Sequence, residues 1–214
     1  MSIAVLVPIS VLRSGVAIED RRLRDRAARR QLISATARVL AEREGWDAVT
    51  TRRLSTEIEY SQPVIYQHFV SMEDLVEAIA LEGFGELAEA LGEARRRAAP
   101  DEALGAVARA YSTYGTENPA LYDAMFTRAT RLRFGPQDSA APLSTAYAEM
   151  RAAAATIAGE QDVDTLTEVL WAALHGLTTL SRNDRLRPHH GTDRIDLLVA
   201  QFRAARSRHL SAQP

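Results

Sequence analysis

The chain has 214 residues and 46% of them are hydrophobic, so it is long and apolar enough to bury a core in one or two domains. It contains no Cys, which excludes disulfides, thiolate catalysis and Cys-ligated zinc. Its formal net charge is −2 at pH 7, so any affinity for nucleic acid has to come from a local basic surface.

The first 23 residues are expected to form a disordered arm. Residues 3–12 are an apolar run, but no positive charge precedes it and Pro8 interrupts it, which is atypical of a secretory signal peptide. No run approaches the roughly 20 apolar residues of a membrane-spanning helix. We therefore expect a cytoplasmic protein without a membrane segment.

Basic residues concentrate near the amino terminus. Residues 21–69 hold ten Arg against six acidic residues, so this segment is net positive and the remainder is net negative. All cations in the chain are Arg, whose planar fork suits phosphate. Residues 21–30 (RRLRDRAARR) can contact phosphates or the minor groove, or they can simply be a solvated helix start; the composition leaves both open.

Apolar residues recur at helical spacing nearly everywhere, and no stretch keeps the alternation of a strand, so we predict an all-α fold. The first helix is expected over residues 24–43, and Gly45 is placed to end it. Thr50 has the position of an N-cap for a short second helix over residues 51–59.

A short third helix follows, with Ser61 as its cap and a proline in its first turn. Ile65 and Phe69, four residues apart, are expected to be buried against the first two helices. The second and third helices then form a helix-turn-helix. Gln pairs with adenine edges in the major groove, and Tyr and His reach phosphates, although Tyr and His can also be packing residues. The residues left near the outer side are Gln62, Pro63, Tyr66, Gln67 and His68.

Ser71 to Asp74 have the pattern of a capping box that opens a long fourth helix. No flexible linker separates the modules, so we place their boundary in this helix, with a helix-turn-helix domain at 24–70 and a second helical domain at 71–214. The later helices are expected to start at Pro100-Asp101, Asn118-Pro119, Pro142, Asp164 as a cap, and Thr192.

Residues 32–79 resemble the DNA-binding domain of TetR-type (tetracycline-repressor-like) transcriptional regulators. The residues that carry the resemblance are Gly45-Trp46, Val49-Thr50, Ser61, Ile65-Tyr66, His68-Phe69, Ser71 and Glu73-Asp74-Leu75. The resemblance implies that Thr50 and Arg52 contact phosphates and that the third helix faces DNA. The candidate DNA-binding residues are therefore Thr50, Thr51, Arg52, Ser61, Gln62, Pro63, Tyr66, Gln67 and His68.

The chain departs from the family pattern at two positions. The turn between the second and third helices usually holds Gly, whereas this chain has Glu59, which we expect to adopt a positive φ. Met72 stands where a Lys directed toward phosphate is usual.

The second half resembles the C-terminal domain of one subgroup of the same family, named for a Trp-His-Gly signature, at residues 118–126 (NPALYDAMF) and 171–180 (WAALHGLTTL). The resemblance implies an all-helical half whose last two long helices pair with a partner subunit and whose middle helices surround a ligand pocket. An ordinary aromatic core is the alternative. The candidate pocket residues are Phe84, Tyr111, Tyr114, Tyr122, Met125, Phe126, Trp171 and His175.

Together these features predict a homodimeric repressor that binds a palindromic operator in double-stranded DNA and is released by a small, apolar effector. We expect no metal, cofactor or catalytic residue: His189-His190 lack further ligands at regular spacing, and no nucleophile elbow or phosphate-binding Gly loop is present. Two alternatives remain. One is a DNA-binding regulator controlled by a protein partner without a small-molecule pocket; the other is a small helical enzyme that uses His175.

Overall fold

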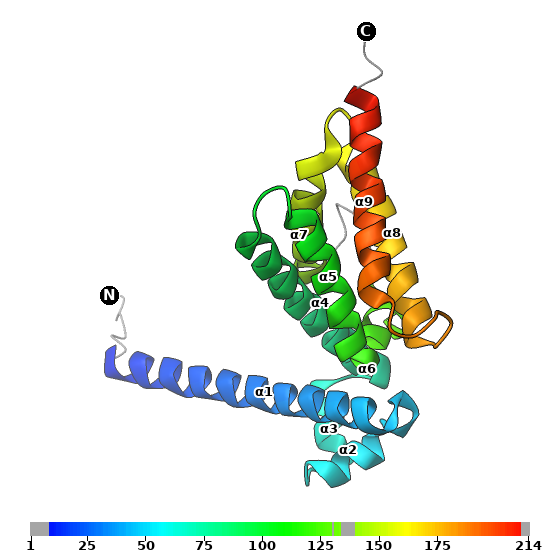
Figure 1. The fold of residues 1–214 in the computed structure, drawn as a ribbon. Coiled ribbons are helices and arrows are strands. Elements are labelled where there is room, and N and C mark those ends of the chain that lie inside the picture. The colour runs from blue at the N-terminus through cyan, green and yellow to red at the C-terminus, as the bar shows by residue number, and fades with distance from the viewer. Residues whose placement is uncertain (1–8, 130, 134–139, 211–214) are drawn as a thin grey trace. The chain divides into compact units, whose positions relative to one another are not determined.

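The computed structural model describes residues 9–129, 131–133 and 140–210 (Figure 1). All regular structure in these residues is helical, which confirms the predicted all-α fold. The chain divides into two compact units, residues 1–75 and 76–214, so the division falls inside α4. The elements are α1 (Ile9–Glu44), η1 (Trp46–Ala48), α2 (Thr51–Glu57), α3 (Gln62–His68), α4 (Met72–Arg97), α5 (Ala103–Glu117), α6 (Pro119–Asp123), the π-helical turn η2 (Ala124–Arg128), α7 (Ala141–Ala158), α8 (Val163–Arg182) and α9 (Gly191–Leu210).

Helix α1 begins much earlier than the sequence suggested. It is helical from Ile9 rather than from Arg24, which corrects the expected disordered arm for residues 9–23; residues 1–8 lie outside the described residues. The segment contains no Pro, the residue least compatible with a helix interior. Residues 19–32 are exposed, and this part of the helix therefore lacks the buried apolar stripe by which a helix is recognised in a sequence.

In the first unit, α1, α2 and α3 contact one another around a small apolar core. Gly45 ends α1 with a φ of 84°, a conformation that favours glycine. One side of each helix is buried because its apolar residues are spaced three, four or seven apart. The core residues are Ile33, Ala37 and Leu40 of α1, Leu54 of α2, and Ile65 and Phe69 at α3.

The helix starts of the first unit follow their predicted caps. The Thr50 hydroxyl oxygen accepts a hydrogen bond from the Arg53 N–H at 3.2 Å. Ser71 accepts from the Asp74 N–H at 3.2 Å, as in a capping box, but the Asp74 carboxylate accepts from the N–H of Val70, one residue before the cap, at 3.2 Å rather than from that of Ser71. Ser61 occupies the N-cap position of α3, but its side chain makes no capping hydrogen bond.

In the second unit, α5 contacts α7, α8 and α9. Small residues let the helices approach closely. A Cβ on Gly83 would lie 2.8 Å from side-chain atoms of Leu121 and Met125, and a Cβ on Gly115 would lie 2.5 Å from Thr178. Only glycine fits at these two positions without movement of the neighbours. None of the described helices is long and apolar enough to cross a membrane.

The cap of α8 differs from the prediction. Asp162, not Asp164, is the N-cap, and its carboxylate accepts from the Thr165 N–H at 2.7 Å. This bond is the main reason why the pKa of Asp162 lies below its ordinary value. Asp164 lies in the first turn and forms an ion pair with Arg151 at 2.6 Å. Two Asp residues at alternate positions are equivalent as caps in a sequence, and only the path of the chain into the helix decides between them.

Candidate functional site

The turn between α2 and α3 sets the geometry of the helix-turn-helix. Helix α2 ends at Glu57, and Glu59 adopts a φ of 56°, which confirms the expected positive φ. The Tyr60 N–H then donates to the Ser55 carbonyl at 3.1 Å, the bond that closes a Schellman-type helix end. Because Glu carries a Cβ, this turn is formed at a conformational cost that Gly would avoid.

One side of α3 is buried and the other is exposed. Ile65 and Phe69 are each only 1% exposed, which confirms their predicted burial. On the opposite side Tyr66 is 52% exposed, and Gln62 and Gln67 are exposed as well. The outer side therefore presents two amides and a phenol, groups that hydrogen-bond to base edges and phosphates. Ser61 and Pro63 are also exposed, at the start of the helix.

His68 lies between α3 and α1 rather than fully on the outer side. It is half-buried, and its carbonyl accepts a hydrogen bond from the Arg30 guanidinium, which also lies 4.0 Å from the centre of the Phe69 ring. Burial is the main reason why the pKa of His68 falls below its ordinary value, and Arg26, Arg29 and Arg30 lower it further. His68 is therefore neutral at pH 7 and can offer phosphate an N–H but no charge.

At the start of α2 the two arginines differ in whether they have partners among the described residues. Thr50 and Arg52 are exposed and Thr51 is half-buried. Arg53 is occupied, because it forms ion pairs with Glu57 at 3.0 Å and with Glu44 at 3.2 Å. Arg52 forms no ion pair within the described part of the chain, so it is the arginine of this turn that remains for an anion.

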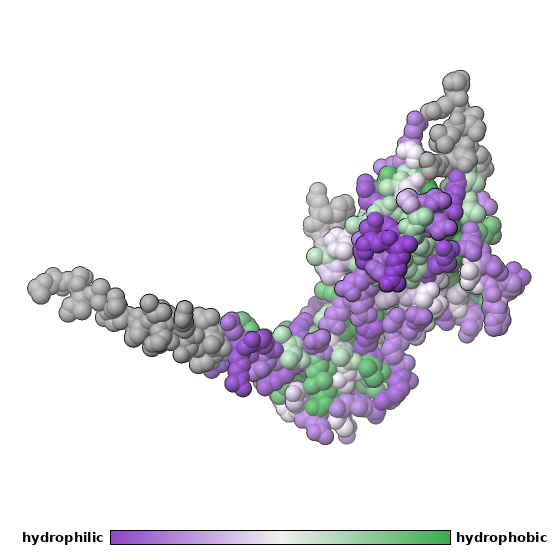
Figure 2. Space-filling view, turned by 60° about the vertical axis from the view of Figure 1, so that its left-hand side comes forward, coloured by the Kyte–Doolittle hydropathy of each residue, from purple (hydrophilic) through white to green (hydrophobic). Residues whose placement is uncertain are grey.

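A row of arginines on α1 lies beside the end of α3. Arg22, Arg26 and Arg29 follow one another at spacings of four and three residues, so they share one helix face. Together with Asp25, Gln67 and His68 they line a concave surface of about 550 Å³. Three cations against one carboxylate make this surface positive. Figure 2 shows that the described surface of α1 nearest its amino-terminal end is hydrophilic.

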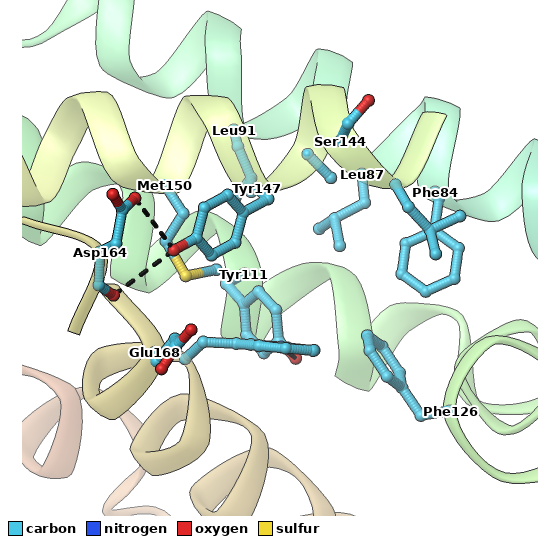
Figure 3. A pocket seen from close by; sticks show the side chains of 13 residues that line it. Phe84, Leu87, Leu91, Tyr111, Phe126, Ser144, Tyr147, Met150, Asp164 and Glu168 are labelled. Carbon is cyan, nitrogen blue, oxygen red and sulfur yellow. Dashed lines mark hydrogen bonds between the residues drawn. The ribbon is translucent and has the colours of Figure 1, made fainter. Parts of the chain in front are cut away.

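The second unit contains a cavity of about 350 Å³ between α4, α5, η2, α7 and α8 (Figure 3). Phe84, Tyr111, Phe126 and Trp171, four of the eight residues predicted for a pocket, line it. The rings of Phe84 and Phe126 meet edge to face with their centres 5.3 Å apart. The volume is that of a site for a small organic molecule.

The other four predicted residues do not line this cavity. Tyr122 is buried behind the wall, where its hydroxyl bonds to the Tyr111 hydroxyl at 2.9 Å and to His175 Nδ1 at 2.7 Å. Tyr114 is buried with its hydroxyl donating to the Gly83 carbonyl at 2.8 Å. Met125 is buried against Gly83. These side chains pack into the protein interior and do not enclose the cavity.

A hydrogen-bonded chain connects the cavity wall to this inner layer. Trp171 Nε1 donates to the Tyr111 hydroxyl at 3.2 Å, and the Tyr111–Tyr122–His175 bonds continue it. Burial raises the pKa of Tyr111 well above its ordinary value and that of Tyr122 to about 12. Burial, and then Arg182, lower the pKa of His175. A neutral His175 that accepts from Tyr122 at Nδ1 is consistent with all three shifts.

Sequence reasoning missed the contribution of α7 and of the first turns of α8. Leu143, Ala146 and Met150 repeat at three and four residues along α7, a signal that could have been found. In the described part of the chain no group of three His, Asp or Glu residues could hold a metal ion. The additional lining residues are Leu87, Leu91, Leu143, Ser144, Ala146, Tyr147, Met150, Asp164 and Glu168.

Comparison with protein families gives two matches. Residues 32–79 match the family described as bacterial regulatory proteins, tetR family. Residues 104–204 match the tetracyclin repressor-like C-terminal domain. An uncharacterized HTH-type transcriptional regulator of Mycobacterium tuberculosis is 33% identical over 159 residues, which are 71% of this chain and 69% of the relative.

Solved structures share the fold. A protein of unknown function from Rhodococcus sp. RHA1 aligns with a TM-score of 0.68 at 22% identity, over 82% of this chain and 94% of that protein. BioQ, solved with its natural double-stranded DNA operator, aligns with a TM-score of 0.58 at 21% identity, over 80% of this chain and 96% of BioQ. At these identities the structural likeness shows a common fold.

Proposed function

The chain belongs to the tetR family of DNA-binding transcriptional regulators, and from this premise we propose that it is a homodimeric repressor released from a palindromic operator by a small molecule. One observation carries the proposal for DNA. The burial of Ile65 and Phe69 leaves the polar side of α3 exposed within a rigid helix-turn-helix. Two such helices in a dimer would enter successive major grooves, one per half-site.

Within each half-site we assign different tasks to the exposed residues. Gln62 and Gln67 have the amide groups that read adenine edges, so they are the proposed base-reading residues. Tyr66, which is 52% exposed, can serve a base or a phosphate. The candidates that would contact the sugar-phosphate backbone are Thr50, Thr51, Arg52, Ser61, Pro63 and His68.

The arginine row of α1 extends this proposed interface. Arg22, Arg26 and Arg29 form no ion pair within the described residues, so their charges are available to phosphates. Each phosphate contact that is neutralised adds about 0.9 to the slope of log affinity against log salt concentration. Replacing all three by Gln should therefore lower the slope by about 2 to 3 per subunit without changing sequence preference. An unchanged slope would remove α1 from the interface.

A homodimer is supported by apolar residues that α8 and α9 leave exposed. Val169 and Leu180 of α8 are 55% and 41% exposed, and Leu197 of α9 is 62% exposed. Val169 and Leu180 are eleven residues apart, a spacing that places them on one face. A second copy that covers these side chains would bury apolar surface that otherwise contacts water.

The cavity in the second unit is the proposed effector site. A ligand that binds one arrangement of the dimer more tightly than the other shifts the population toward it, and release from DNA follows if that arrangement has the wrong half-site spacing. The second candidate function is control by a protein partner without a small molecule. The cavity of about 350 Å³ favours the effector.

Gel-shift titration on DNA flanking the coding region of this protein tests the proposal, with the mass in solution measured in parallel. A dimer that shifts one fragment in preference to an unrelated fragment at physiological salt is expected. A folded dimer that binds neither fragment even at low salt would defeat the DNA-binding role proposed for α3. Thermal unfolding with and without hydrophobic ligands separates the two forms of control, because only a small-molecule receptor gains stability from a bound ligand.

A further inference from the structure

The cavity of the second unit has two chemically different ends (Figure 3). Phe84 and Phe126 lie at one end. Tyr147, Asp164 and Glu168 gather at the other, where α7 faces the first turns of α8. A ligand that spans the cavity therefore meets hydrocarbon at one end and carboxylates at the other.

Most polar groups of the wall already have partners. The Tyr111 hydroxyl is bonded to Trp171 and Tyr122, and the Ser144 hydroxyl donates to the Ala141 carbonyl at 2.9 Å. These hydroxyls stabilise the wall itself, and a ligand would compete with bonds that are already made.

The two carboxylates at this end of the cavity differ in whether they already have a partner. Asp164 is paired with Arg151 at 2.6 Å and also lies 3.3 Å from the Tyr147 hydroxyl. Glu168 has no hydrogen bond or ion pair within the described part of the chain. Burial, followed by the charges of Asp164 and Glu168, raises the pKa of Tyr147, which indicates that both carboxylates act on that hydroxyl. Because Arg151 balances Asp164, the unbalanced charge at this end of the cavity is that of Glu168.

We propose that the cavity binds an amphipathic monocation, whose apolar body packs against Phe84 and Phe126 and whose positive group lies beside Glu168. The inference rests on the proposed effector site and names the chemical class of its ligand, which the sequence had suggested to be apolar. Glu168 is exposed, so water solvates its carboxylate in the absence of a ligand; a cation beside it gains a Coulomb attraction that a neutral ligand lacks, and an anion is repelled. The ring faces of Tyr147 and Trp171 also attract a cation.

Three probes of similar size distinguish a preference for a cationic, a neutral or an anionic ligand. Benzyltrimethylammonium is the cation, neopentylbenzene is its neutral isostere with carbon in place of nitrogen, and benzylsulfonate is the anion. Calorimetric titration into the full-length dimer compares the wild type with Glu168→Gln. The matched control is Glu89→Gln, which removes one charge from an exposed position outside the cavity. Unfolding temperature and operator binding of both variants verify that they fold.

Glu168→Gln should weaken the cation about fivefold, the upper range for a solvent-accessible ion pair, and change the neutral isostere less than twofold. The same substitution should strengthen the anion, and Glu89→Gln should change none of the three. Equal effects of Glu168→Gln on the cation and the neutral isostere would overturn the inference while leaving the cavity as a ligand site. If the wild type binds none of the probes, the proposed effector site fails together with the inference.

Discussion

The two units of this molecule use their aromatic and polar side chains in opposite ways. In the first unit Ile65 and Phe69 are buried, and Tyr66 and Gln67, their neighbours in sequence, are left outside on a seven-residue helix. In the second unit Tyr111 and Tyr122 are turned inward, bonded to each other, and form or support the wall of a cavity. A convex polar helix suits a long charged polymer, whereas a largely apolar cavity suits a small molecule.

The difference also shows what holds each candidate site in shape. The exposed side of α3 depends on apolar contacts beneath it, since a helix of this length is not stable alone. The cavity depends on the hydrogen bonds of Tyr111 in its wall and on close contacts behind it at Gly83 and Gly115. Changes to the core of the first unit should therefore affect DNA binding, and changes to the polar interior of the second unit should affect the cavity.

The largest effect is expected for Phe69→Ala. Phe69 is 1% exposed and lies beneath the Arg30 guanidinium, so the truncation should cost about 3 to 5 kcal/mol of unfolding free energy. DNA binding should be lost while ligand binding in the second unit persists. Urea unfolding measures the loss of stability, and gel shift measures the loss of DNA binding. Tyr66→Ala is the matched control: it should lose DNA affinity with a stability change of at most about 0.5 kcal/mol. A stable Phe69→Ala protein that still binds DNA would contradict the dependence of α3 on the apolar contacts beneath it.

A smaller loss is expected for Gly115→Ala in the second unit. The new Cβ would lie 2.5 Å from Thr178 and 2.9 Å from the Tyr122 ring, so the inner layer has to move, at a cost of about 1 to 3 kcal/mol. Gly85→Ala serves as control, because nothing lies within 4 Å of its Cβ and Ala is the better helix former by about 0.5 to 1 kcal/mol. Thermal unfolding should rank the proteins Gly85→Ala, wild type, Gly115→Ala. A Gly115→Ala protein as stable as the wild type would show that the layer is loosely packed.

A pH-limited effect is expected for His175→Gln. Burial lowers the pKa of His175 in the folded protein. Below about pH 6.5 the unfolded chain therefore binds a proton more readily than the folded protein does, and the unfolding free energy decreases as the pH is lowered. Gln removes this contribution, so its curve of unfolding free energy against pH should be flatter in that range than the wild-type curve. Above about pH 7.5 the two curves should run parallel, which provides the control within the experiment. Parallel curves throughout would mean that His175 titrates alike in both states.

The smallest effect is expected for Glu59→Gly. Gly at a φ of 56° removes the cost of a left-handed residue with a Cβ, and its greater freedom in the unfolded chain offsets part of the gain. A net stabilisation of about 0.5 kcal/mol by chemical denaturation, with unchanged DNA binding, should follow. A loss of stability would indicate that the Glu59 side chain contributes contacts of its own.

The first unit was more predictable than the second for a physical reason. Caps and the burial of Ile65 and Phe69 are local properties that residue type and spacing determine, whereas the positive φ at Glu59 was expected from the resemblance to the tetR family. A cavity is defined by space that side chains leave unfilled, and helical spacing does not distinguish a residue that lines such space, as Phe126 does, from one that fills it, as Tyr122 does. The start of α1 at Ile9 was missed because residues 19–23, which join the helix start to the predicted helix, are exposed and form no buried apolar stripe.

Gln67 tests the central claim, that the polar side of α3 reads bases, most directly. Binding of the wild type and of Gln67→Ala is measured to the operator and to every single-base substitution of it. At one position the wild type should lose about 1 to 3 kcal/mol on substitution, and Gln67→Ala should bind the substituted and original sequences equally. If Gln67→Ala keeps the full wild-type pattern of discrimination at all positions, Gln67 does not read a base; the same result for Gln62→Ala would contradict the reading surface as a whole.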